Sequence, residues 1–472
     1  MLHDDIINAY CAILEEELVP AMGCTEPIAV AFAAAKARQI LGSMPDHAEI
    51  FCSPNIVKNV KSVTVPNTGG MKGIETAVIA GILANAADLE LSVLQALRPE
   101  DRARIAFLKN EDFCTVHLAE DIEGLYIDLR LFGKSFGKSP TSNAAEANTL
   151  LQQPQLEGRS ARVVLKDTHT NISLIEKDGI QIYPTAADTA FAAASDSSGI
   201  HSASKPLVRT SRLSPDRREY RMLRLRTIVE FAQTVPLEKV AAPIRRQIEM
   251  NSAIADEGLA NQWGMSVGKT LLSQRDPTDV RTRARARAAA GSDARMAGCA
   301  LPVVINSGSG NQGLTASLPV IEYAHSLGAD EETLIRALVI SNLVALEQKE
   351  YIGKLSAYCG AVSAAVGAAA AIAWLEGAEY DQIAATVTNA IATADGILCD
   401  GAKSSCAAKV ATALEAAILA KELALAGGRS FSPGEGLVGS DVDQTIRNIG
   451  IVGSEGMRPT DKQIIRIMLG KD

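Results

Sequence analysis

The spacing of apolar residues changes several times in the first 205 residues, which predicts a region of mixed helices and strands. Apolar side chains recur at helical intervals over 6–14 and in the Ala-rich run 28–40, with a break at Pro20 and Gly23. A further helix is predicted at 73–86. Alternation and β-branched residues predict strands at 49–65, 103–108, 115–118, 125–131, 162–166, 171–176 and 180–183, with Asp178-Gly179 as the hairpin turn between the last two.

After residue 205 the strand signal nearly disappears. Helical periods follow one another from Tyr220 to the end, and a polar cluster at 194–205 reads as a linker. We therefore predict the α+β class, with an α+β domain at 1–205 that holds a small mixed sheet and an all-helical domain at 206–472. The N-terminal helices are free to pack on the second domain.

Composition narrows the class of protein further. The 472 residues are 47% hydrophobic and only 4% aromatic, and the formal charge is -9. Such a chain is globular with Ala-rich and Leu-rich cores, and its charge repels nucleic acid. The stretch 355–375 has no charged residue but is mostly Ala, Gly and Ser, which favours a buried core helix over a membrane span. The acidic N-terminus lacks the basic segment of an export signal, so we expect a cytoplasmic protein.

The arginines and histidines suggest no site by their spacing. Arginines 281, 283, 285, 287 and 295 do not form one helical stripe, and we expect them on a solvated surface with ion pairs. The histidines, at 3, 47, 117, 169, 201 and 325, show no metal-binding spacing, and we assign them no role.

Three cysteines, Cys359, Cys399 and Cys406, form the strongest candidate for chemistry. On one continuous helix Cys399 and Cys406 would lie about 10 Å apart, so a loop beginning at Asp400-Gly401 must bring them together. Three thiolates on a four-iron cluster would leave one iron free to act as a Lewis acid. The alternative is that all three are small buried core residues.

A fourth cysteine, Cys24, lies in Gly23-Cys24-Thr25-Glu26-Pro27, where the next helix is predicted to begin. A thiol at a helix N-terminus tends to have a lowered pKa, which suits a base, a nucleophile or a ligand. A buried thiol with no chemical role is the alternative.

Two glycine-rich stretches could bind a carboxylate or phosphate through backbone N–H groups. The first contains Asn67, Thr68, Gly69 and Gly70, and the second contains Ser307, Gly308, Ser309, Gly310 and Asn311 and continues to Gly313. Neither is a P-loop. The alternative for each is a turn whose glycines supply positive φ.

These motifs, in this order along nearly the whole chain, resemble the L-cysteine desulfidase family. They are Gly-Cys-Thr-Glu-Pro, Asn-Thr-Gly-Gly, Gly-Ser-Gly-Asn-Gln-Gly, Tyr-Cys-Gly and Cys-Asp-Gly-Ala-Lys-x-x-Cys. That family is similar in its helical half to the α-domain of iron-sulfur L-serine dehydratases. The resemblance implies that Cys359, Cys399 and Cys406 ligate a [4Fe-4S] cluster and that Cys24 is an active-site residue. It further implies elimination of sulfide from L-cysteine, which gives pyruvate and ammonia.

In that reading the substrate carboxylate binds to Asn67–Gly70 or Ser307–Gly313, and the α-proton passes to Cys24 or to a lysine such as Lys354. The chain departs from serine dehydratases in a shorter spacing of the last two cysteines and in lacking their histidine motif near Cys24. The rivals are an L-serine dehydratase and a non-catalytic protein that binds metal or senses redox state. A pyridoxal-phosphate lyase is disfavoured because the helical half does not suit that cofactor. A homo-oligomer stays open, because Ala-rich helices pack within or between subunits.

Overall fold

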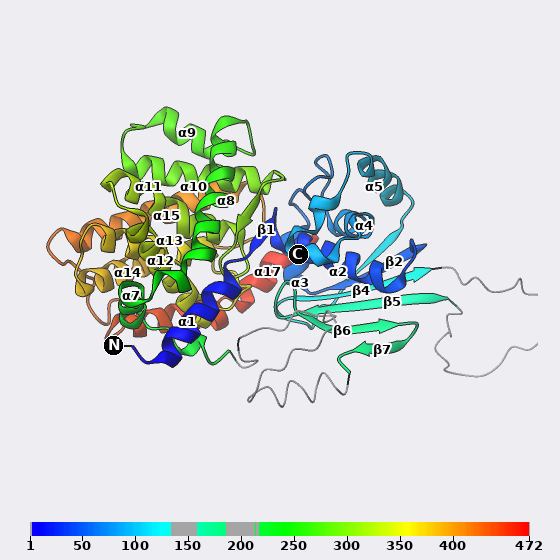
Figure 1. Ribbon diagram of the computed structural model, residues 1–472, viewed down its shortest axis with the longest axis horizontal. Coiled ribbons are helices and arrows are strands. Elements are labelled where there is room, and N and C mark those ends of the chain that lie inside the picture. Colours follow the sequence, from blue (N-terminus) through cyan, green and yellow to red (C-terminus); the bar gives the residue numbers. More distant parts are fainter. Residues whose placement is uncertain (1, 134–157, 186–212, 214–216, 472) are drawn as a thin grey trace, which may run out of the picture.

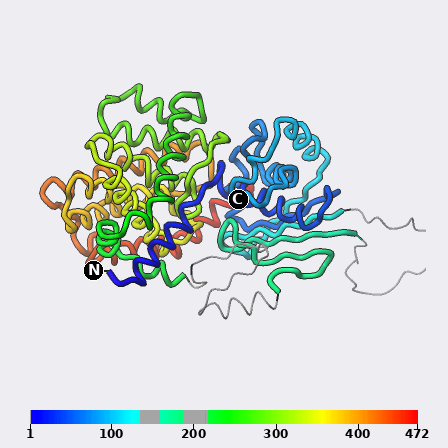
Figure 2. The backbone as a smooth tube through the Cα atoms, viewed as in Figure 1, coloured from blue at the N-terminus to red at the C-terminus, as the bar shows by residue number. Residues whose placement is uncertain are grey.

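The computed structural model describes residues 2–133, 158–185, 213 and 217–471, and it has two lobes side by side, one built on a sheet and one built of helices (Figure 1). The α+β class is as predicted. The first residues run along the helical lobe before the chain enters the sheet lobe, and the chain ends near the boundary between the two (Figure 2). The predicted linker at 194–205 lies outside the described residues.

The sheet lobe contains six strands in the order β3-β2-β4-β5-β6-β7. β2 and β3 are parallel and the other neighbours are antiparallel, so the sheet is mixed. Asp178 and Gly179 both have positive φ, which confirms the predicted hairpin turn between β6 and β7. The strands are β2 (His47–Cys52), β3 (Cys114–Leu118), β4 (Tyr126–Gly133), β5 (Arg159–Lys166), β6 (Ile172–Lys177) and β7 (Ile180–Tyr183).

Helices cover one face of this sheet, with α2 packed on β4 and β5 and α4 packed on α2 (Figure 1). They are α2 (Thr25–Leu41), α3 (Pro54–Val60), α4 (Ile74–Ala84), the 3-10 segment η1 (Ala87–Ala96) and α5 (Asp101–Asn110). Two strand predictions are wrong here. The strand predicted at 103–108 lies in α5, whose Ala, Arg, Leu and Lys residues favour a helix. The strand predicted at 49–65 ends at Cys52, because Pro54 begins α3.

The helical lobe surrounds α13, whose residues 361–373 are all buried. This helix packs against α11, α12, α14 and α15, which confirms that the uncharged stretch is a core helix. The lobe comprises η2 (Tyr220–Met222), α7 (Leu225–Thr234), η3 (Leu237–Lys239), α8 (Ala241–Ala260), α9 (Val267–Gln274), α10 (Val280–Met296), α11 (Gly310–Leu327), α12 (Glu331–Ile352), α13 (Gly360–Leu375), α14 (Tyr380–Ala394), α15 (Ser405–Leu425), α16 (Val442–Ile451), η4 (Val452–Gly456) and α17 (Arg458–Leu469).

Each end of the chain packs on the lobe formed mainly by the other half of the sequence. α1 (Asp4–Glu17) packs on η2 and α12, and α17 packs on α3. β1 (Pro20–Met22) pairs antiparallel with β8 (Pro302–Val304), so that Pro20 lies opposite Val304. This short pairing directly precedes both Cys24 and the Ser307 loop in the sequence, and it therefore brings those two motifs together.

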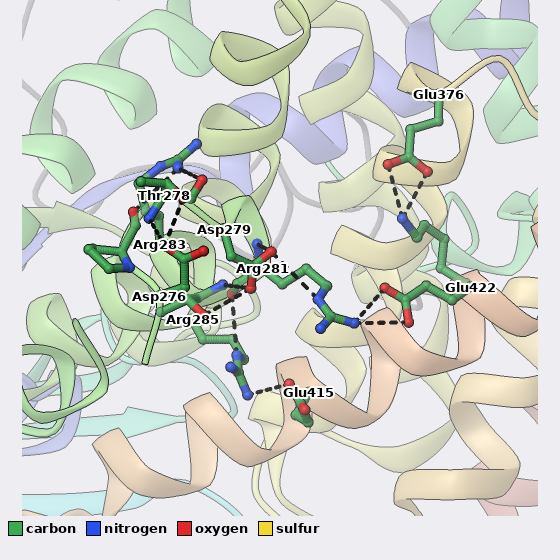
Figure 3. Close-up of polar contacts among 12 residues, drawn as sticks. Asp276, Thr278, Asp279, Arg281, Arg283, Arg285, Glu376, Glu415 and Glu422 are labelled. Atoms are coloured by element: carbon green, nitrogen blue, oxygen red, sulfur yellow. Dashed lines mark hydrogen bonds and ion pairs between the residues drawn. The ribbon is translucent and has the colours of Figure 1, made fainter. Parts of the chain in front are cut away.

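Four of the five arginines of α10 form ion pairs as predicted, but the predicted surface position is wrong for Arg285, which is buried, as well as for Arg295. Arg281 pairs with Glu422 at 2.9 Å, and Arg285 pairs with Glu415 (Figure 3). Arg283 and Arg287 both pair with Glu322. Arg295 is only 2% exposed and is therefore not on the surface. It lies on the last turn of α10. The next residue, Met296, packs against Cys24 of the other lobe.

In the described ranges no single helix is long and apolar enough to cross a membrane. α4 and η1 satisfy length and composition only as a pair, and the chain bends by 105° between them.

Candidate active site

Cys359 and Cys399 are brought together because the residues just before them, Tyr358 and Leu398, pair in a short antiparallel backbone bridge. The Cys359 N–H donates to Ile397 at 3.1 Å, and the Cys399 N–H donates to Ala357 at 2.7 Å. In extended backbone, alternate residues and direct partners share a face, so the two cysteine side chains project from the same side. The predicted loop after Cys399 is present, because α15 begins only at Ser405.

Cys406 is the second residue of α15, and it completes a group of three neighbouring thiols. Burial, reinforced mainly by the Cys399 thiol, raises the pKa of Cys359 to about 12. Burial also raises the pKa of Cys406, with Cys399 contributing. Since the Cys399 thiol acts on the pKa of both Cys359 and Cys406, the three sequence-predicted ligands lie close together. They are buried or half-buried and none forms a disulfide.

Three thiols of this kind match the chemistry of iron-sulfur ligands, which are usually thiolates. In the described part of the chain, no three His, Cys, Asp or Glu side chains are close enough to hold one metal ion. A four-iron cluster is larger than one ion, so its thiolate ligands stand farther apart. Two lysines lie near the thiols, and each already has an acidic partner. Lys58 donates to the Cys399 carbonyl and pairs with Asp461, and Lys409 donates to Leu398 at 2.6 Å and pairs with Asp400. The donor set therefore fits an iron-sulfur cluster.

Cys24 lies beside this group, because it packs with Val63 and Met296 in a cluster that also contacts Cys406. It is the N-cap of α2, as predicted, but its thiol donates to Glu26 Oε2 at 3.1 Å. Burial and the Glu26 carboxylate raise the pKa of Cys24 well above its ordinary value. The lowered pKa expected from the helix N-terminus is therefore wrong, because these two effects outweigh the helix dipole.

Glu26 is held by several polar groups at once. Its carboxylate accepts hydrogen bonds from Thr25 and from Asn59 Nδ2, each at 3.1 Å, and His169 Nε2 lies 3.8 Å away. Burial alone would raise the pKa of Glu26, but His169 and Cys24 outweigh burial and hold it at about 2. Glu26 is therefore a buried anion that fixes the Cys24 thiol in place. His169, to which the sequence assigned no role, belongs to this site.

The second glycine-rich loop, Ser307–Gly313, joins these groups. Gly308 faces the His169 ring, since a Cβ there would lie 2.8 Å from Cε1. Gly310 faces the Arg295 guanidinium, and Gly360, next to Cys359, faces Gln312. Asn311 accepts a hydrogen bond from Ser292 at 3.0 Å. Since Ser309 is the N-cap of α11, the loop presents a helix N-terminus at the site.

The first glycine-rich loop, Asn67–Gly70, lies at the edge of the site. Thr68 donates to the Val65 carbonyl at 2.7 Å, and Asn67 donates to Leu94 at 2.9 Å, so both side chains stabilise the turn itself. The loop lines a pocket of about 300 Å³ with Trp263 and the turn at 297–300. Pro66, just before the loop, touches Gly23. The glycines therefore face a pocket between the lobes.

Two lysines near the end of α12 have different settings. Lys354 pairs with Glu17 at 3.0 Å, and Glu17 also accepts from Tyr220 at 2.6 Å. Lys349 is 5% exposed and forms no ion pair with any residue the structure describes. Burial lowers the pKa of Lys349 to about 8, although Cys399 and Cys359 act in the opposite direction. The lysine beside the cysteines is thus Lys349, whereas Lys354 is held in an ion pair with Glu17.

Sequence reasoning missed His169, Arg295 and Lys349 for a common reason. Each lies outside a recognisable motif and reaches the site through the tertiary fold. Arg295 had one local signal, because it ends a run of small residues, 288–294, that is buried throughout. Lys349 likewise follows a long apolar stretch of α12.

Residues 88–466 match the serine dehydratase alpha chain, and the chain belongs to that family, which suggests a lyase-type enzyme. Its relatives include UPF0597 proteins over their full length. The protein of Lachnoclostridium phytofermentans is 44% identical over 97% of this chain and 98% of its own. That of Desulfitobacterium hafniense is 44% identical over 99% and 98%, and that of Finegoldia magna is 42% identical over 98% and 99%.

Proposed function

We propose that this protein is an L-cysteine desulfidase, which converts L-cysteine and water into pyruvate, ammonia and hydrogen sulfide. The observation that carries the proposal is the backbone bridge that sets Cys359 and Cys399 on one face, next to Cys406 and close to Cys24. Family membership supports a lyase.

Cys359, Cys399 and Cys406 would hold a [4Fe-4S] cluster. When bound, the cluster supplies a Lewis acid for the departing sulfur, because three protein ligands leave one iron open. A soft thiolate leaving group suits such an iron better than an alkoxide does, which favours cysteine over serine.

The chain's own residues bind and orient the amino acid. The amides of Ser307–Asn311 hold the carboxylate at the N-terminus of α11. Lys349 Nζ accepts the α-proton, because no carboxylate among the described residues pairs with Lys349, whereas Lys354 is paired with Glu17. The C–S bond breaks and its electron pair leaves with sulfur. The aminoacrylate product leaves and hydrolyses to pyruvate and ammonia.

Cys24 keeps its proton at Sγ in this proposal. Its hydrogen bond to Glu26 and its raised pKa make a thiolate base unfavourable at neutral pH. A neutral thiol in this position lies against the substrate and holds a proton close to the leaving group.

L-Serine dehydration is the second candidate, because the family description names serine dehydratase. The two activities share the site and differ only in the leaving group. Pyruvate from L-cysteine and from L-serine, measured in parallel with oxygen-free protein reconstituted with iron and sulfide, separates them. We expect equal amounts of sulfide and pyruvate from cysteine, and turnover of serine alone would refute the desulfidase.

Replacement of one cysteine tests the ligand assignment. We expect Cys359→Ala to lose the visible absorbance of the cluster and to lose activity by about a thousandfold or more, since a Lewis acid is worth several kcal/mol. Cys11→Ala is the matched control, because Cys11 lies on α1. A Cys359→Ala protein that keeps both its absorbance and its activity would sink the assignment.

A further inference from the structure

Arg295 is a buried cation without a partner in the described structure. Its side chain is 2% exposed, and its Nε has no hydrogen-bond acceptor. It forms no ion pair or hydrogen bond with any described residue, although four other arginines of α10 are all paired. Burying an unpaired guanidinium is strongly unfavourable. A bound anionic ligand that pairs with Arg295 would explain why the side chain is buried.

The guanidinium lies against the first residue of α11. A Cβ at Gly310 would lie 2.2 Å from Arg295 Nε and 2.7 Å from Cζ, so only glycine leaves room there. The N-cap residue Ser309 makes no side-chain hydrogen bond to the helix, so no capping side chain accepts from the first amides. A fixed positive charge and a helix N-terminus therefore face the same small region.

No acidic group nearby neutralises Arg295. The Arg295 charge acts on the Cys24 thiol, but that thiol keeps a pKa well above its ordinary value and donates to Glu26. Glu26 itself is occupied by Thr25, Asn59 and Cys24. Among the described residues no side chain supplies the missing negative charge, so a bound anion would supply it.

We propose that Arg295 and the N-terminus of α11 together bind the carboxylate of the substrate. This inference rests on the proposed function and deepens it. It selects the Ser307–Asn311 loop over Asn67–Gly70 as the carboxylate site, and it identifies Arg295 as the side chain that binds the carboxylate. A planar guanidinium can hold a carboxylate with two parallel hydrogen bonds, which a lysine cannot do. The site thereby accepts amino acids with a free α-carboxylate and rejects their amides and the corresponding simple thiols.

The test compares binding of 3-mercaptopropionate with binding of its amide, which differ only at the carboxylate. Calorimetry under anaerobic conditions on the cluster-loaded protein measures both. We expect the wild type to bind the acid about 10- to 100-fold more tightly, from the strength of charge-assisted hydrogen bonds. Arg295→Gln should remove this preference, and Arg295→Lys should retain only part of it.

The control is Arg285→Gln, which removes a buried arginine of the same helix that is paired with Glu415. It should keep the preference for the acid. Equal binding of acid and amide by the wild type, or an equal loss of both in Arg295→Gln, would overturn the proposal. Should Arg295→Gln not fold, the wild type and Arg295→Lys decide the question.

The outcome also separates this inference from the proposed function. A preference for the acid that depends on Arg295, without turnover of cysteine or serine, would leave the anion site standing and refute the desulfidase. Turnover of cysteine without such a preference would support the desulfidase and refute the role of Arg295.

Discussion

The two ends of α10 carry the same type of residue in opposite settings. Near its start, Arg281 and Arg285 reach Glu422 and Glu415 on α15, so their charges are neutralised within the chain (Figure 3). At its end, Arg295 is buried and has no such partner in the described structure. Ion pairs of the first kind connect helices, whereas an unpaired buried charge is costly and points to a ligand.

The same contrast separates the two lysines of the site. Lys354 is paired with Glu17, while Lys349 is buried beside the thiols without an acidic partner among the described residues. Paired charges should therefore matter for stability, and unpaired ones for activity. The following changes test that division, beginning with the largest expected effect.

Lys349→Met should lower kcat by about 100- to 10,000-fold, the range for loss of a general base. Lys354→Met, the matched variant, should lower it less than about tenfold. In the wild type, kcat should rise with pH up to about 8, because burial holds the pKa of Lys349 near that value and the base must be unprotonated. Steady-state rates of sulfide release at several pH values check this. If Lys354→Met were the more damaging change, the division would fail.

Glu26→Gln should lower the free energy of unfolding at pH 7 by about 3 kcal/mol, because Glu26 is a buried charge that is neutralised within the chain. Its pKa falls from an ordinary value of 4.5 to about 2 on folding. The contribution is therefore fully present above pH 4.5 and is lost as the pH falls toward 2. Urea denaturation at pH 7 and pH 4 measures it.

The control for this change is Glu415→Gln, since the Glu415 side chain is 54% exposed. It should cost well under about 1 kcal/mol. A Glu26→Gln protein as stable as the wild type at pH 7 would contradict the account of the site.

Arg285→Met should destabilise the protein by about 1 kcal/mol, because it removes a partly buried ion pair. Arg295→Met should be no less stable than the wild type, since it removes a buried charge that no side chain neutralises. Urea midpoints of the two variants give the comparison directly. A loss of several kcal/mol in Arg295→Met would mean that the guanidinium has a partner inside the chain.

Much of the fold followed from local patterns. The strands with clear alternation and the long apolar helices were predicted because their periodicity depends on neighbours in sequence. The strand predicted at 103–108 failed because a short apolar run also suits one face of a helix such as α5. The pairing of β1 with β8 could not be predicted, because three residues are too few to show a period and the partners are distant in sequence.

The site followed from sequence only where a motif marked it. Cys359, Cys399 and Cys406 were found by type and order, and the structure places them together. The pKa of Cys24 was not predictable, because it depends on burial and on the Glu26 carboxylate rather than on its helix position. Arg295 looked like its neighbours in sequence, and only the packing of α10 against Gly310 distinguishes it.

The pairing of β1 with β8 has a consequence for how the protein is made. Cys24 leaves the ribosome long before β8, the Ser307 loop and Cys399 have been synthesised. At about 5 to 20 residues per second, the interval between Cys24 and Cys399 is about 20 to 75 s. During that time the Cys24 thiol lacks its neighbours from the second half of the chain, such as Met296 and Cys406. If Cys359, Cys399 and Cys406 hold the proposed cluster, it would be loaded only after nearly the whole chain has been translated.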